Sequence, residues 1–264
     1  PSFRTFQRQF QLGILPVLAA DWLQGAHLFQ LFRSGGFLHS QIAALYSLGF
    51  ASNALCGVFS RSLVDRVGRR RSCVFSCLLC SLCCLLQHSR QFPALAAGRI
   101  LGGVGTSLLF PSFESWYGHE HSERHDFPRE WVPHAFARLA LWNGGLAVGA
   151  GVVAELLVLL GGPTAPFAAA VPLQAASALF LLKNWDENYG KARGECGEGL
   201  RALRDPRRAL LGAVQAVVEG ILLIFIFLWT PVLDPLGIPL GIAFSGLMAA
   251  SAVGSALSRR GAGR

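Results

Sequence analysis

The sequence predicts an all-α membrane protein that crosses the bilayer several times. Hydrophobic residues make up 52% of the 264 residues and charged residues only 14%, whereas soluble domains carry about 25% charged residues. The apolar residues gather into runs of about 20 residues, the length that an α-helix needs to cross a bilayer. A dense basic turn at 65–71 separates two such runs. It must stay in water while both flanks lie in lipid.

Hydropathy places eight spans, each an apolar run between polar segments. The first lies between Arg8 and Arg33, and the second and third flank the basic turn. The fourth follows Arg90, the fifth follows a loop rich in His and Glu, and the sixth ends at Lys183. The last two follow a basic segment that ends at Arg208. The expected spans are 10–32, 40–60, 72–88, 93–117, 135–160, 166–183, 209–230 and 240–257.

The basic residues predict the orientation of these spans. Nineteen of the 23 Lys and Arg residues fall on the side of the N-terminus, two fall within spans, and only Arg33 and Arg90 fall on the other side. Loops rich in Lys and Arg are cytoplasmic. We therefore expect the N-terminus, the 61–71 turn and the 184–208 segment to be cytoplasmic. The net charge of +8 is then explained by basic loops that orient the spans in the lipid bilayer. We therefore expect no nucleic-acid partner.

Six spans, a long polar connection and further spans follow the plan of the major facilitator superfamily. The basic turn resembles the motif between the second and third helices of that superfamily. The matching residues are Asp65, Arg66, Gly68, Arg69 and Arg70. A second resemblance is the pattern R-x-x-x-G-x-G, which starts at Arg99. The resemblance implies a six-helix bundle at 1–183, a cytoplasmic linker at 184–208 and the start of a second bundle at 209–264.

Three further stretches, 20–24, 113–128 and 227–235, resemble the molybdate-transporting family of that superfamily. That family implies twelve spans, so we expect this chain to be truncated after eight. The resemblance implies secondary active transport of molybdate or a similar oxyanion by alternating access, with a coupled proton or an exchanged anion. Two alternatives stay open: a non-transporting membrane scaffold or receptor, and an inactive truncated form.

Polar side chains inside the spans are the candidate substrate and coupling residues, because an intramembrane charge costs at least about 2.5 kcal/mol. Asp21 and Glu219 lie near the middles of spans that the superfamily pairs across a central cavity, where a desolvated carboxylate carries a proton. The guanidinium of Arg99 can bind two oxyanion oxygens at once. The remaining candidates are Gln24, Asn143 and Gln215. For each charge the alternative is a structural contact between helices.

A cytoplasmic gate is expected beside the basic turn. Glu114 lies fifteen residues after Arg99, which is about 22 Å along a helix, so these two cannot pair. We expect Glu114 to pair with Arg69 or Arg70 when the inner mouth is closed. The candidate gate residues are Asp65, Arg66, Gly68, Arg69, Arg70 and Glu114.

No metal site, cofactor or enzyme activity is expected. A stripe of cysteines along the third span cannot surround one ion, so packing is favoured. These cysteines are Cys73, Cys77, Cys80 and Cys84. The histidines at 119–125 are expected to be solvated or hydrogen-bonded rather than to bind zinc. The sequence contains no P-loop, nucleotide-binding motif or hydrolytic triad pattern.

Overall fold

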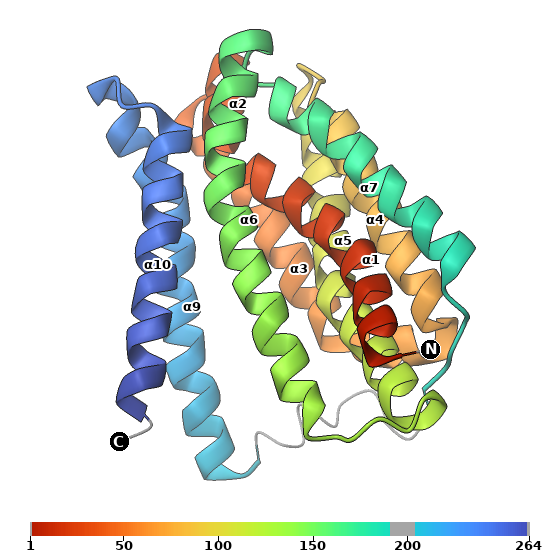
Figure 1. Cartoon of the computed structure of the whole chain (residues 1–264). Helices are drawn as coiled ribbons and strands as arrows, with labels where there is room; N and C mark the ends of the chain where they lie inside the picture. Colours follow the sequence, from red (N-terminus) through yellow and green to blue (C-terminus); the bar gives the residue numbers. More distant parts are fainter. Residues whose placement is uncertain (1, 191–203, 263–264) are drawn as a thin grey trace.

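The computed structural model describes residues 2–190 and 204–262, and these are almost entirely helical (Figure 1). The α-helices are α1 (Phe3–Gly25), α2 (Leu28–Ser34), α3 (His39–Val67), α4 (Arg69–Leu86), α5 (Phe92–His119), α6 (Trp131–Gly161), α7 (Ala165–Asn184), α9 (Pro206–Leu233) and α10 (Leu240–Ala262). A π-helical turn, η1 (Glu120–Arg124), extends α5, and a 3-10 turn, η2 (Asp234–Leu236), follows α9. The all-α membrane fold is therefore confirmed.

Local sequence explains where several helices begin and end. Gly68 has a φ of +110°, a value that glycine adopts freely, and it is the single residue between the end of α3 and the start of α4. Gly162, with a φ of +79°, ends α6. At the start of α9 the side chain of Asp205 accepts a hydrogen bond from the backbone N–H of Arg207, and Pro206 occupies the first helical position.

The first predicted span is two helices rather than one. α1 ends at Gly25, and α2 leaves it at an angle of 49°. Hydropathy cannot show this break, because both pieces are apolar. The fourth predicted span also differs, since the helix runs past residue 117 through η1 to Arg124.

Five helices of the described chain are long and apolar enough to cross a membrane, or six if the bent α1–α2 pair counts as one span. The other two predicted spans coincide with α4 and α10. Three arginines occupy the first turn of α4, and the apolar part of α10 is only Leu240–Gly254. Each of the eight predicted spans thus falls on a helix or helix pair. By length and hydropathy, however, only five or six of these are able to cross a membrane.

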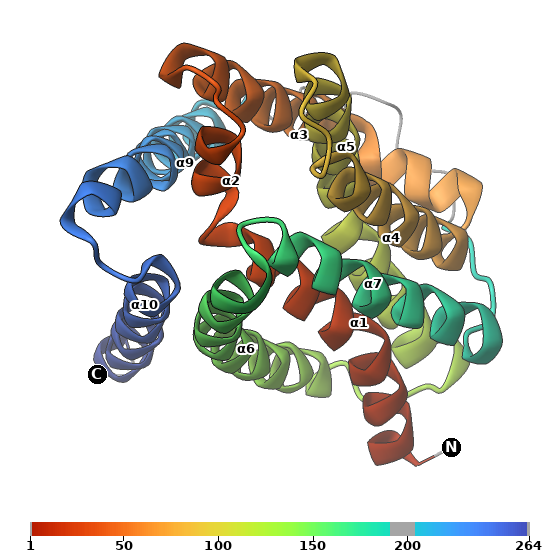
Figure 2. The same ribbon diagram turned by 90° about the horizontal axis from the view of Figure 1, so that it is seen from above.

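The helices pack through close contacts between small residues, as expected in a membrane, where apolar burial does not by itself favour association. α5 packs against α3 and α4, while α1 packs against α6 and α7. At the α3–α5 crossing, a Cβ on Gly103 would overlap the Gly49 carbonyl oxygen and Ser52 Oγ. Figure 2 shows α9 and α10 beside this bundle, where α10 packs against α6 and α9 touches α2. The large apolar side chains of α9 are mostly exposed, as suits a lipid-facing helix.

Candidate functional site

A central cavity of about 410 Å³ lies between the bundle formed by α1–α5 and the pair α9 and α10. Aromatic and aliphatic side chains form much of its wall, including Trp22, Phe50, Trp229 and Phe244. Five polar or charged side chains also line it: Asp21, Gln24, Asn53, Arg99 and Thr106. A largely apolar wall with a few converging polar groups is the usual form of a small-ligand site.

Arg99 is the cation of this cavity. Its guanidinium lies over the backbone of Gly49, where a Cβ would come within 2.7 Å of Nη2, and Cζ is 5.8 Å from the ring centroid of Tyr46. Nε is buried without a hydrogen-bond partner, and within the described chain Arg99 forms no ion pair within 4.0 Å. No described residue accepts a hydrogen bond from Arg99, so this guanidinium on the cavity wall suits an anionic ligand.

Asp21 lines the same cavity with an accessible side chain, close enough to Arg99 for electrostatic interaction but without an ion pair within 4.0 Å. Gln24 also faces the cavity, although its Nε2 donates to the Ala20 carbonyl oxygen of its own helix at 3.0 Å. The structure therefore brings together three of the six predicted substrate and coupling residues: Asp21, Gln24 and Arg99.

The other three predicted residues lie outside the cavity wall. Asn143 Oδ1 accepts a 2.7 Å hydrogen bond from the Trp22 indole N–H. This bond helps to hold Trp22, which lines the cavity. Gln215 Nε2 donates to Glu219 Oε1 at 2.8 Å, and both side chains are exposed. Glu219 lies one turn before Leu222, the first α9 residue of the cavity. Of the two carboxylates expected on helices that line one central cavity, Asp21 lies on the cavity wall and Glu219 does not.

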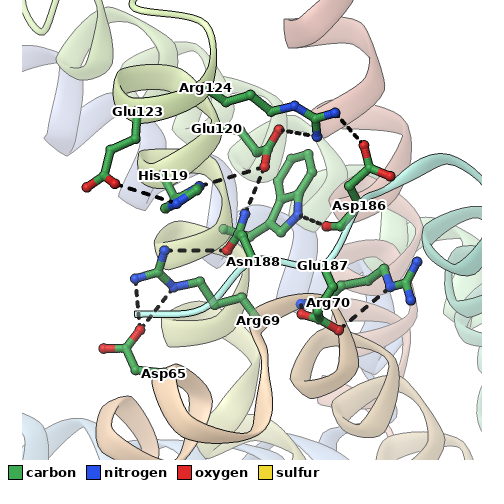
Figure 3. Close-up of polar contacts among 11 residues, drawn as sticks. Asp65, Arg69, Arg70, His119, Glu120, Glu123, Arg124, Asp186, Glu187 and Asn188 are labelled. Carbon is green, nitrogen blue, oxygen red and sulfur yellow. Dashed lines mark hydrogen bonds and ion pairs between the residues drawn. The ribbon is translucent and has the colours of Figure 1, made fainter. Parts of the chain in front are cut away.

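A polar network closes the basic end of the bundle, where α3, α4 and α5 meet the segment after α7 (Figure 3). Arg69 Nη2 lies 2.8 Å from Asp65 Oδ1, one turn earlier in the sequence. The Arg69 backbone N–H donates to the Asn188 carbonyl oxygen at 3.0 Å, and Asn188 Nδ2 donates to Glu120 Oε1 at 3.0 Å. Arg124 bridges Glu120 and Asp186 at 3.1 and 2.6 Å.

Residues 185–190 form what we call the clamp, an extended segment laid across the start of α4 and the end of α5. Glu187 accepts hydrogen bonds from the backbone N–H groups of Arg70 and Arg71 at 2.9 and 3.1 Å, so its carboxylate caps the positive end of α4. Trp185 is 2% exposed and stacks on Trp116 with ring centroids 3.5 Å apart. The start of the predicted 184–208 linker is therefore a packed element, and residues 191–203 lie outside the described part of the chain.

Glu114 does not take part in this network. It is exposed and, within residues 2–190 and 204–262, makes no ion pair, while Arg69 pairs with Asp65 and Arg70 lies 3.8 Å from Glu187. The carboxylates that meet the basic turn are instead Asp65, Glu187 and, through Asn188, Glu120, which is only 3% exposed. The acidic run after α7 was the available sequence signal for Glu187. Arg66 is exposed.

The His-rich segment is largely helical rather than a loop. His121 is buried, and its Nε2 lies 2.9 Å from the Pro128 carbonyl oxygen. Burial lowers the pKa of His125 below its ordinary value. Its ring packs against Phe6 and Phe127. In the part of the chain that is described, no group of three or more His, Cys, Asp or Glu side chains is placed to hold a metal ion.

The clamp leads to a first prediction. Glu187→Gln removes the charge that caps α4, and a hydrogen bond to a charged group contributes about 1.5–3 kcal/mol. We expect the melting temperature of the purified protein in detergent to fall. Glu123→Gln is the matched control, because the Glu123 side chain is 57% exposed and its one ion-pair partner among the described residues is His119, at 3.6 Å. Equal melting temperatures for the two variants would contradict the capping role.

Fold and site together define a multi-pass helical membrane protein with a charged central cavity. Its family is shown by the match of residues 1–262 to a family model described as sugar transporters, 12 TM. The chain belongs to this family, which lies within the major facilitator superfamily.

Curated relatives agree with this assignment. The chain is 52% identical to the molybdate-anion transporter of Xenopus tropicalis over 265 residues, which cover 98% of the chain and 59% of the relative. It is 50% identical to the molybdate-anion transporter of Takifugu rubripes, over 98% of the chain and 60% of the relative. The chain thus spans about three fifths of the length of these relatives.

Solved structures share the fold. A crystal structure of the POT family transporter PepTSo matches 97% of this chain and 53% of its own, with a TM-score of 0.60 and 14% identity. A second POT family transporter, crystallised with a thioalcohol-conjugated peptide, matches 86% of this chain and 47% of its own, with a TM-score of 0.55 and 15% identity. At these identities the likeness concerns the fold alone.

Proposed function

We propose that the chain acts in a secondary active transporter that moves molybdate or a similar oxyanion across the membrane by alternating access. The observation that carries this proposal is Arg99, a guanidinium with unused donors on the wall of the central cavity. A planar guanidinium can bind two oxygens of one oxyanion at once. The names of the curated relatives favour molybdate as the anion.

Asp21 supports coupling to a proton. An oxyanion bound at Arg99 would lie beside the Asp21 carboxylate in one cavity, and two negative charges in a low dielectric repel each other unless one takes up a proton. Uptake of a dianion into a negative cell also opposes about 2.3 kcal/mol per charge per 100 mV. A coupled proton would relieve both problems, and an exchanged anion would relieve the second.

Tracer molybdate uptake at several external pH values tests this proposal. The test compares this chain, a chimera extended with the remaining C-terminal part of the Xenopus tropicalis relative, and cells without either, using tungstate and sulfate as competitors. We expect Asp21→Asn to flatten the pH dependence of uptake, while the matched control Glu219→Gln, which changes a carboxylate outside the cavity wall, leaves it intact. No uptake above background from either chain would remove the transporter assignment in favour of a membrane scaffold or receptor. A pH profile that survives Asp21→Asn would make Asp21 structural.

We also propose that the chain divides into an N-terminal bundle (1–183), a cytoplasmic linker (184–208) and the start of a second bundle (209–264), with the N-terminus and the 61–71 turn cytoplasmic. The distribution of Lys and Arg supports this orientation. Arg61→Cys and Arg90→Cys are matched probes, because both arginines are exposed near opposite ends of the bundle. In a background without native cysteines, an impermeant thiol reagent on intact cells should label position 90 and not position 61. The reverse pattern would overturn the orientation.

A further inference from the structure

His27 and Glu155 face each other at the break between α1 and α2. His27 is the residue before α2 and is 1% exposed, while the Glu155 side chain, from the second half of α6, is 16% exposed. Buried ionisable groups in a membrane are costly, so each such group suggests a function. Neither residue lines the central cavity.

Glu155 joins three elements at this point. Its Oε2 accepts a 2.7 Å hydrogen bond from the backbone N–H of Gly241, the second residue of α10, and lies 3.6 Å from His27 Nε2. A carboxylate at the start of a helix is stabilised by the helix dipole. α10 and α6 come close at two glycines, Gly241 on α10 and Gly151 on α6. A Cβ on Gly241 would overlap the Gly151 carbonyl oxygen, so glycine there allows α10 to reach Glu155. Ser245 Oγ also donates to the Val148 carbonyl oxygen at 2.7 Å.

The contacts of His27 indicate that the His27–Glu155 pair holds a proton. His27 Nδ1 lies 3.0 Å from Gln30 Oε1, and with the amide oxygen as acceptor the donor in this contact is Nδ1–H. A neutral His27 would then direct the bare lone pair of Nε2 at a carboxylate oxygen, and two acceptors repel each other. One proton on Nε2 or on the carboxyl group makes the contact attractive. His27 Nε2 has no other partner among the described residues.

Other ionisable groups lie on the segments around this site, and His88 and Arg90 line a pocket with the end of α2 and the end of α6. The neighbouring ionisable groups also include Asp21 on α1, six residues before His27 and on the cavity wall, and the pair Arg33–Asp234, which joins α2 to η2 at 4.0 Å. The side chains of α10 at 240–254 include no ionisable group, and Lys183 of α7 lies at the opposite end of its helix.

We propose that His27 and Glu155 form a proton-binding site that fastens α10 to the α1–α2 break. With Glu155 ionised and His27 protonated, the carboxylate caps α10 and pairs with the imidazolium. A second proton, taken up by Glu155, removes the negative charge on which its contacts with His27 and Gly241 depend, and α10 loosens from the α1–α2 break and from α6. In the proposed transporter this site would be a second proton site, separate from Asp21, where α10 meets α6 and the α1–α2 break.

Infrared difference spectroscopy of the purified chain without any anion substrate tests the proton site. The acid-minus-neutral spectrum should contain a protonated carboxyl C=O band that Glu155→Gln removes. In His27→Gln, which keeps a donor but cannot titrate, the band should appear at a shifted pH midpoint. Asp234→Asn and Glu219→Gln are matched controls that should retain it. A Glu155→Gln spectrum that keeps the whole band would overturn the proposal.

A distance measurement tests the fastening. Spin labels at Ser34 and Ile242, in a background without native cysteines, report the separation of α2 and α10. The distance should lengthen on acidification in the parent chain and in Asp234→Asn, while Glu155→Gln should show the acid distance at every pH. A distance that does not respond to pH in the parent chain would refute the proposal. Because neither measurement uses molybdate, failed uptake with an intact proton response would disprove only the transporter assignment.

Discussion

Replacing Arg99 with lysine is expected to weaken molybdate binding by roughly tenfold to a hundredfold while the protein still reaches the cell surface. Lysine keeps the positive charge but loses the planar fork that binds two oxygens. A hydrogen bond to a charged group contributes about 1.5–3 kcal/mol, which corresponds to this range. Arg99→Met, which removes the charge as well, should abolish uptake. Competition of unlabelled molybdate against tracer measures the affinity of each variant in the extended chimera.

The matched control for this prediction is Arg138→Lys. Arg138 is the second arginine within a predicted span, but it is exposed and lies outside the wall of the central cavity. The same change there should leave affinity unaltered. If Arg99→Lys binds molybdate as tightly as the parent chain, Arg99 does not hold the anion through its fork, and its role is structural.

The second large effect is expected at the crossing of α3 and α5. Gly103→Ala should destabilise the protein severely, because the new methyl group would overlap the Gly49 carbonyl oxygen and Ser52 Oγ, and come 2.9 Å from the Asn53 backbone nitrogen. Overpacking typically costs about 1–3 kcal/mol, and here backbone rather than a flexible side chain would have to move. The readout is the melting temperature in detergent together with the monodisperse fraction on size exclusion.

Gly145→Ala is the control for that experiment. Gly145 lies within α6, and a Cβ there would meet no atom within 4 Å. Alanine is a better helix former than glycine by about 0.8–1.0 kcal/mol, so this variant should be as stable as the parent or slightly more stable. Equal stability of Gly103→Ala and Gly145→Ala would mean that α3 and α5 do not approach closely at Gly103.

Sequence reasoning succeeded where the signal is local. The all-α membrane class follows from apolar runs of membrane-crossing length, and Asp65, Gly68 and Arg69 are near neighbours in the chain, so their meeting at one turn followed from their spacing. Arg99 and Asp21 were chosen because a charge inside an apolar run is visible without any structure, and both lie on the cavity wall, while their roles stay predictions. The bend after Gly25 was missed, because it does not change hydropathy.

The contacts seen between side chains that lie far apart in the chain were not predicted from the sequence. Glu114 and Glu219 were chosen by their depth along a helix, but depth does not determine which way a residue faces, and both are exposed. Glu187 meets Arg70 across 117 positions, and His27 meets Glu155 across a similar separation. Hydropathy and the helical period are properties of one segment, and they determined that this chain is a bundle of membrane helices with a basic end. The rotation of each helix about its axis, and the small residues that allow close crossing, decided which charges meet, because these depend on packing between segments.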